Sequence, residues 1–136
     1  MAHIVIEYSS NLRGELDVQG LVDAAHAAAL KTGLFPIGGL RTRAYEAQGY
    51  RIADGHPQNA FIHFELRVGH GRDIDTRRRA CEQIFAAVCA QLDGLYARLP
   101  LGISLQMQEL HAELNYKKNN LHEYVRSRQN PEGPTG

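Results

Sequence analysis

The feature that most constrains the fold is a strict alternation of apolar and polar residues over residues 60–68. One set is apolar and contains Ile62, Phe64, Leu66 and Val68. The other set is largely polar and contains Phe61, His63, Glu65 and Arg67. A period of two indicates a β-strand with one buried face. The chain is therefore expected to form a sheet whose apolar face is covered by other elements.

A helix and a second strand follow this strand. From Asp75 to about Arg98, an apolar stripe recurs at helical spacing: Ala80, Ile84, Val88, Leu92 and Leu95. Leu99-Pro100 ends the helix, and residues 102–109 alternate again. A helical crossover of this length returns the chain parallel to the first strand. Residues 59–110 are thus predicted to form one β-α-β unit.

The same order of elements occurs earlier, over residues 2–50. A short strand at residues 3–8 precedes a helix that Asp17 can cap and that runs to about Thr32. Gly33 is a natural stop, and a strand begins near Leu40. The predicted fold class is α+β: tandem β-α-β units form a four-stranded mixed sheet with two helices on one face. We expect a single domain over residues 1–126, with a helical turn or two near its end, and a disordered tail at 127–136.

This layout leaves one face of the sheet without helices. The sequence holds no third helix of comparable length to cover it. Association of several copies is the simplest way to bury such a face. A homo-oligomer is therefore expected.

Composition excludes several classes of partner. Fifteen basic and fifteen acidic residues cancel, so no overall field favours nucleic acid or an anionic membrane. No apolar run approaches a membrane span, and no secretory signal is present. Cys81 and Cys89 lie about 12 Å apart on one predicted helix, too far for a disulfide. A cytoplasmic location is expected.

Metal and nucleotide sites are not indicated. The seven histidines show neither His-x-His nor i, i+4 helical spacing. Gly69-His70-Gly71 lacks the third glycine and the acidic residue of a dinucleotide fingerprint. The aromatic-rich basic motif of ferredoxin-like RNA-binding modules is also missing. No metal or cofactor is expected.

Five separated blocks carry a family resemblance. They are residues 1–7, residues 33–43, Ala53-Asp54-Gly55, Gly69-His70-Gly71-Arg72 and residues 109–120. In this order they resemble 5-carboxymethyl-2-hydroxymuconate Δ-isomerase of the tautomerase superfamily, from residue 2 to about residue 125. The resemblance implies a tautomerase-like trimer. It also implies ketonisation of an unsaturated hydroxy-polycarboxylate in aromatic-compound breakdown, on the homoprotocatechuate pathway.

The resemblance assigns the candidate catalytic residues. The family uses an N-terminal proline, exposed by loss of Met1, as general base, and Ala2 occupies that position here. An α-amine suits keto–enol chemistry because its pKa lies near neutrality and falls further beside cations. Arg41 and Arg72 match the family's arginines, which bind substrate carboxylates and stabilise developing negative charge. His3 adjoins this site and is a candidate substrate contact.

Alanine in place of proline leaves alternatives open. A primary amine rotates more freely than a proline nitrogen, which loosens the geometry of proton transfer. It can also form an imine with a carbonyl substrate. The alternative function is a catalytically impaired or non-catalytic trimeric homologue that binds small dicarboxylates. Decarboxylation or hydration in the same pocket also remains open.

Overall fold

The structure is a computed structural model and describes residues 1–130. Its main elements, in chain order, are β1 (Ala2–Ser9), α1 (Val18–Lys31), β2 (Leu40–Ala47), β3 (Ala60–Val68), α2 (Ile74–Gln91), α3 (Asp93–Arg98), β4 (Leu101–Glu109) and α4 (Leu121–Gln129). Two 3-10 turns, η1 (Ser10–Leu12) and η2 (Ile37–Gly39), follow β1 and precede β2. None of the helices within residues 1–130 combines the length and apolar character needed to cross a membrane.

The four strands form one mixed sheet in the order β2-β1-β3-β4. Strand β1 runs parallel to β2, and β3 runs parallel to β4. The two central strands, β1 and β3, are antiparallel. Each half is therefore a β-α-β unit, which confirms the predicted fold class.

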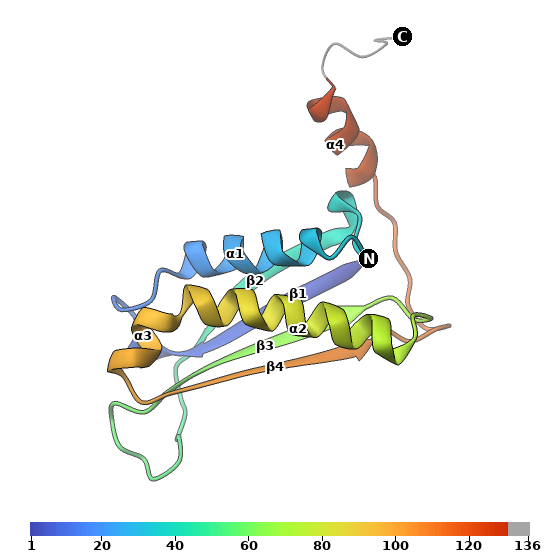
Figure 1. Ribbon diagram of the computed structural model, residues 1–136. Helices are drawn as coiled ribbons and strands as arrows, with labels where there is room; N and C mark the ends of the chain where they lie inside the picture. Colours follow the sequence, from blue (N-terminus) through green and yellow to red (C-terminus); the bar gives the residue numbers. More distant parts are fainter. Residues whose placement is uncertain (131–136) are drawn as a thin grey trace.

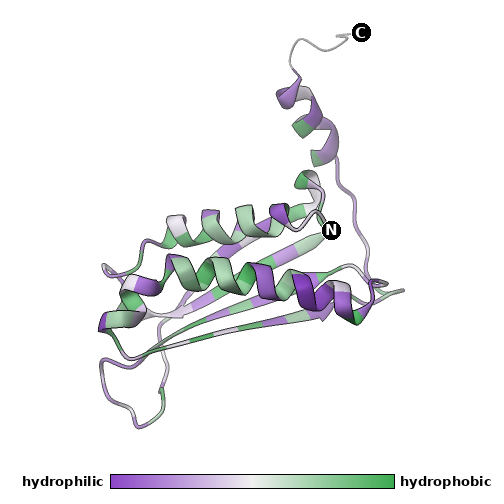
Figure 2. Cartoon of the chain, viewed as in Figure 1, coloured by the Kyte–Doolittle hydropathy of each residue, from purple (hydrophilic) through white to green (hydrophobic). Residues whose placement is uncertain are grey.

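Helices α1 and α2 lie side by side over one face of the sheet (Figure 1). The core between the two layers is built from alternate strand residues and from the apolar helix stripes (Figure 2). Its fully buried side chains include Ile6, Ile62, Phe64, Leu21 and Ile84. Asp17 caps α1 and Asp73 caps α2, since each carboxylate accepts a backbone N–H three residues on.

The second long helix is interrupted, whereas the sequence predicted one helix from Asp75 to Arg98. Helix α2 ends at Gln91 and α3 begins at Asp93. At the break, the Leu92 N–H lies 3.0 Å and 3.1 Å from the carbonyl oxygens of Val88 and Cys89. The bend keeps Leu92 and Leu95 buried, so the apolar stripe that predicted a continuous helix survives the interruption.

The chain after β4 forms an arm, residues 110–130, that ends in α4 and projects away from the two layers (Figure 1). The Asn119 side-chain amide donates to the carbonyl oxygen of Gly38 at 2.9 Å, and α4 packs on η2. Helix α4 reaches Gln129, so the disordered tail predicted for residues 127–136 is wrong for residues 127–129. Residues 131–136 lie outside the described residues.

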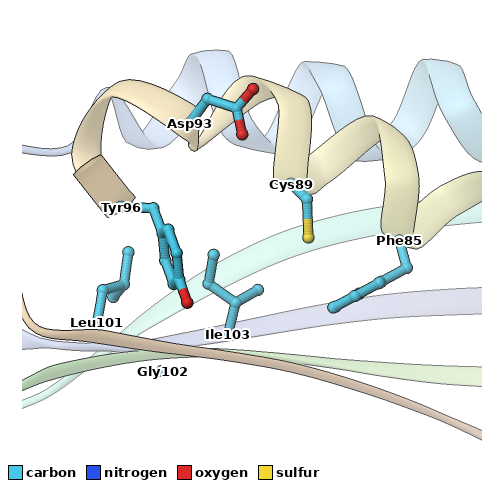
Figure 3. A pocket seen from close by; sticks show the side chains of 7 residues that line it. All are labelled: Phe85, Cys89, Asp93, Tyr96, Leu101, Gly102 and Ile103. Atoms are coloured by element: carbon cyan, nitrogen blue, oxygen red, sulfur yellow. The ribbon is translucent and has the colours of Figure 1, made fainter.

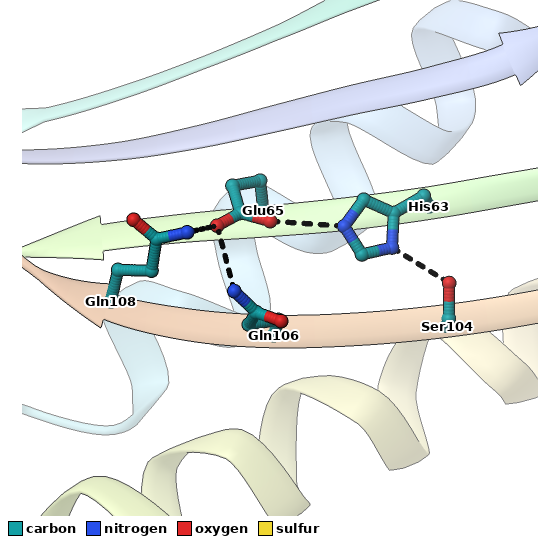
Figure 4. A network of polar contacts seen from close by, with 5 residues as sticks. All are labelled: His63, Glu65, Ser104, Gln106 and Gln108. Atoms are coloured by element: carbon teal, nitrogen blue, oxygen red, sulfur yellow. Dashed lines mark hydrogen bonds and ion pairs between the residues drawn. The ribbon is translucent and has the colours of Figure 1, made fainter.

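Within residues 1–130, no helix covers the opposite face of the sheet, and this face bears a polar network (Figure 4). His63 bonds Ser104 at 2.7 Å on one ring nitrogen and Glu65 at 2.9 Å on the other. Glu65 also accepts from the side chains of Gln106 and Gln108. We call this surface the open face. The side chains of this network bond one another.

Candidate active site

A cavity of about 510 Å³ lies at the start of β1. Its walls come from three further places: the loop before β2, the loop after β3 and the C-terminal arm. The lining includes Met1, Ala2, Phe35, Gly39, Arg72 and Lys117. No aspartate or glutamate is among the described residues that line it. The cavity therefore combines apolar walls with cations, as a site for a small anion requires.

Arg72 joins the two loops that flank the cavity. Its guanidinium donates to the carbonyl oxygen of Leu34 at 2.6 Å. The same group lies over the ring of Phe35, with 5.4 Å between Cζ and the ring centroid. Stacking on a largely buried aromatic ring restricts the guanidinium. Arg72 is thus held at the cavity wall before any ligand arrives.

Glu109, at the end of β4, fixes the loop that carries Arg72. Its carboxylate accepts the N–H of Gly71 at 3.0 Å, and Arg77 lies 3.8 Å away. The Gly71 hydrogen bond holds the pKa of Glu109 below its usual value, and the Arg77 charge lowers it further. Gly71 has a φ of 120°, which only glycine adopts without strain. Arg77 in turn donates to the carbonyl oxygen of Arg72 at 3.1 Å.

His3 and Arg41 lie side by side on the open face, next to the cavity. The strand register pairs His3 with Arg41 on β2 and with Arg67 on β3. The guanidinium of Arg43 lies 3.2 Å from Nδ1 of His3. Burial lowers the pKa of His3, and the surrounding arginines lower it further. His3 is therefore a neutral acceptor among cations near neutral pH.

The α-amine in the structure is that of Met1, which lines the cavity. Burial lowers its pKa, and the charges of Lys117, Arg41 and Arg72 lower it further. Ala2 is 4% exposed and forms the first residue of β1. Removal of Met1 would transfer the amine to Ala2, against the same wall. An amine in these surroundings is neutral over a wider range of pH than a free one.

The predicted site residues are only partly brought together. Ala2 and Arg72 line the cavity, and Arg41 adjoins it through Gly39, whose carbonyl oxygen is 3.5 Å from the guanidinium. His3 lies outside the lining, on the open face. Lys117 was missed by sequence reasoning, because it lies in a segment with no helical or strand periodicity. Its position inside the last of the five family blocks was the available signal.

A second cavity, of about 470 Å³, lies between α2, α3 and β4 and is lined by Phe85, Cys89, Asp93, Tyr96 and Ile103, among others (Figure 3). Burial raises the pKa of the Cys89 thiol, and Asp93 raises it further. A protonated thiol is a poor nucleophile. No cation is among the described residues that line this cavity, which differs in this respect from the first.

Within the described residues no group of three or more His, Cys, Asp or Glu side chains is placed to hold a metal ion. The first cavity brings the α-amine together with Arg72 and Lys117 in its lining, and Arg41 lies beside it.

Two β-α-β units with a cationic cavity around the chain start define a tautomerase-like protein. The family profile of 5-carboxymethyl-2-hydroxymuconate isomerase matches residues 2–125. An Escherichia coli protein, 5-carboxymethyl-2-hydroxymuconate Delta-isomerase, is 34% identical over 122 residues, which cover 90% of this chain and 97% of the relative. The chain belongs to the 5-carboxymethyl-2-hydroxymuconate isomerase family and is an isomerase.

Solved structures agree with this assignment. A crystal structure of 5-carboxymethyl-2-hydroxymuconate delta-isomerase has a TM-score of 0.85 at 33% identity, covering 92% of this chain and 93% of its own. A 5-carboxymethyl-2-hydroxymuconate isomerase from Deinococcus radiodurans R1 has a TM-score of 0.84 at 30% identity, covering 92% and 94%. A fused 4-OT symmetric trimer, at 13% identity and a TM-score of 0.60, covering 85% and 93%, shares the fold alone.

Proposed function

We propose that this isomerase converts 5-carboxymethyl-2-hydroxymuconate, or a close unsaturated hydroxy-polycarboxylate, to its conjugated keto isomer in the breakdown of aromatic compounds. The observation that carries the proposal is the α-amine at the cavity wall, with a pKa lowered by burial and by the cations around it. The relatives' names supply the substrate.

The proposed base is the α-amine of Ala2 after Met1 has been removed. In its neutral form it takes the proton of the enol hydroxyl and returns a proton to a carbon of the conjugated system. The electron pair of the O–H bond becomes the π bond of the new carbonyl group, and the pair of the adjacent C=C bond moves one position along the chain. The pair of the second C=C bond forms the new C–H bond. The same nitrogen acts first as base and then as acid, so the enzyme ends the cycle unchanged.

Arg72 and Arg41 are proposed to bind substrate carboxylates and to stabilise the negative charge that develops on the dienolate oxygen. The support for Arg72 is its restricted guanidinium in the cavity wall. The support for Arg41 is its place beside the cavity, where its charge lowers the pKa of the amine. His3 is proposed as a further substrate contact because it is a neutral acceptor beside Arg41.

A homotrimer is the proposed assembly. The open face is a strand surface without a covering layer, and a protein of the same fold is a symmetric trimer. The proposed location is the cytoplasm, where the free thiols of Cys81 and Cys89 would stay reduced. The unit proposed to act is the single domain of residues 1–126.

A second candidate function is favoured by one observation, the alanine at position 2. A homologue with an impaired base would keep the cationic cavity and bind small dicarboxylates without rapid turnover. This candidate shares the binding residues of the first and differs only in the chemical step.

The test is the ultraviolet-followed ketonisation of 5-carboxymethyl-2-hydroxymuconate by the protein and by its Arg41→Ala and Arg72→Ala variants. Each variant is expected to lose about 100-fold or more in kcat/KM, as the loss of a charge-stabilising donor does elsewhere. Arg13→Ala is the matched control, since Arg13 pairs with Glu46 near the other end of β1. Full activity in both site variants would refute the proposed binding residues. Binding without turnover by the unaltered protein would favour the second candidate.

A further inference from the structure

Lys117 has no assigned contact with the substrate in the reaction proposed above. It lines the 510 Å³ cavity and also an adjoining cavity of about 270 Å³, which Met1, Asn119 and His122 complete. Among residues 1–130, Met1 and Lys117 are the two that line both cavities. The side chain therefore lies between them, beside the chain start.

The arm that carries Lys117 is fastened on its C-terminal side. Asn119 donates to the Gly38 carbonyl at 2.9 Å and accepts the N–H of Leu121 at 3.0 Å. His122 packs so closely on Gly38 that a Cβ there would meet its backbone at 2.8 Å. Ordering an arm costs conformational entropy. These contacts offset that cost and place Lys117 at the cavity without any ligand.

The charge around the chain start is unbalanced. Lys117, Arg41 and Arg72 all act on the α-amine, and Lys117 is the first of these charges in the size of its effect on the pKa. The described lining of the larger cavity supplies no carboxylate to offset them. Cations gathered in a concave site without counter-ions favour the entry of a polyanion. Each of the three can bond one carboxylate.

We propose that Lys117 binds a carboxylate of the substrate, so that the site takes three carboxylates at once and selects tricarboxylates over dicarboxylates. The inference rests on the proposed function, and it extends that function to a third cation and to a rule of selectivity. The substrate named above fits the rule, since its two muconate ends and its carboxymethyl group carry one carboxylate each. In this arrangement Arg41 and Arg72 hold two of them and Lys117 holds the third.

The first experiment compares steady-state kinetics on 5-carboxymethyl-2-hydroxymuconate with those on 2-hydroxymuconate, which lacks the carboxymethyl group. Lys117→Met removes the charge at similar length, and Lys117→Arg retains it. We expect Lys117→Met to raise KM for the tricarboxylate about tenfold or more, as for a lost hydrogen bond to a charged group, and KM for the dicarboxylate less than about twofold. Lys117→Arg should restore most of the loss. Lys118→Met is the control, since Lys118 is the neighbouring exposed lysine outside both cavities.

Equal losses on both substrates would overturn the proposal, because Lys117 would then act on the amine or on the arm rather than on the third carboxylate. Unchanged kinetics in Lys117→Met would overturn it as well.

A second experiment separates failure of this inference from failure of the proposed function. Calorimetry measures the binding of tricarballylate and of glutarate, neither of which can ketonise. Tighter binding of tricarballylate that is lost in Lys117→Met supports the inference even if the protein turns over no muconate. Equal affinity for the two acids, or binding of neither, overturns the inference.

Discussion

The chemical nature of position 2 sets how firmly the proposed base, the Ala2 α-amine, is held. Ala2 would supply a primary amine that rotates about its N–Cα bond, whereas proline would supply a ring nitrogen with fixed geometry. Loss of orientation of a reacting group can cost about 100-fold. We therefore predict that Ala2→Pro raises kcat for ketonisation by about 10- to 100-fold with little change in KM.

The measurement is the ultraviolet assay, with intact-mass spectrometry to establish that Met1 is absent from both proteins. Ala2→Gly, which keeps a primary amine, is the control and should show no gain. A proline variant no faster than the alanine protein would mean that orientation of the amine does not limit the rate.

The pH profile reports on the same amine. Burial and the charges of Lys117, Arg41 and Arg72 lower the pKa of the Met1 α-amine, and the Ala2 amine exposed by loss of Met1 lies against the same wall. The neutral form of that amine is the proposed base. Activity should therefore rise with pH through the lowered pKa and be established at a lower pH than an ordinary α-amine allows. Lys117→Met should move this rise of kcat/KM with pH to higher pH, because the charge of Lys117 no longer lowers the pKa of the amine. If kcat/KM rose at the same pH in Lys117→Met, the amine would not be the titrating base.

A motif in the sequence could indicate where Arg72 lies, while its role in the site stays a prediction. Strand β3 ends at Val68 beside the start of β1, because the two strands are antiparallel. The loop that follows β3 therefore brings Arg72 into the cavity lining. Lys117 escaped prediction because its segment has no periodicity, and its place depends on the distant contact between Asn119 and Gly38. A contact between residues so far apart in the sequence depends on tertiary packing, which the local sequence pattern does not indicate.

At the element scale, the arm and the turn η2 hold each other. Because the Cβ of an alanine at position 38 would meet the backbone of His122 at 2.8 Å, Gly38→Ala should displace α4. We predict faster amide hydrogen exchange over residues 117–129 and a raised KM, since Lys117 moves with the arm. Gly49→Ala is the matched control, because nothing lies within 4 Å of a Cβ built there. Unchanged exchange in Gly38→Ala would show that the arm is not held at this turn.

Elements with a strong local signal could be predicted almost to the residue. Strand β3 occupies residues 60–68 as expected because its alternation is unbroken, and α1 begins after Asp17 because that side chain caps it. The interruption between α2 and α3 at Leu92 could not be predicted from the local sequence pattern. Burial of Leu92 and Leu95 against the sheet is compatible with a bent helix as well as a straight one, so the apolar stripe does not distinguish them.

For the whole molecule, the open face is the proposed subunit contact of the proposed trimer. Val5 lies there on a central strand, opposite Arg43 on β2 and Glu65 on β3. If three copies bury this face, Val5→Lys places an added ammonium beside Arg43 in a region without water, which costs several kcal/mol. We predict that the unaltered protein has three times the 15.1 kDa of the chain by light scattering, and that Val5→Lys dissociates at micromolar concentration.

Ala27→Lys is the control for the added charge, since Ala27 is an exposed residue of α1 on the far side of the molecule. It should leave both mass and activity unchanged. Circular dichroism separates dissociation from unfolding, because a folded monomer keeps the helix signal of α1 and α2. The activity of a folded Val5→Lys monomer then tells whether the cavity at the chain start works alone. A Val5→Lys protein that stays trimeric would place the subunit contact elsewhere than on the open face.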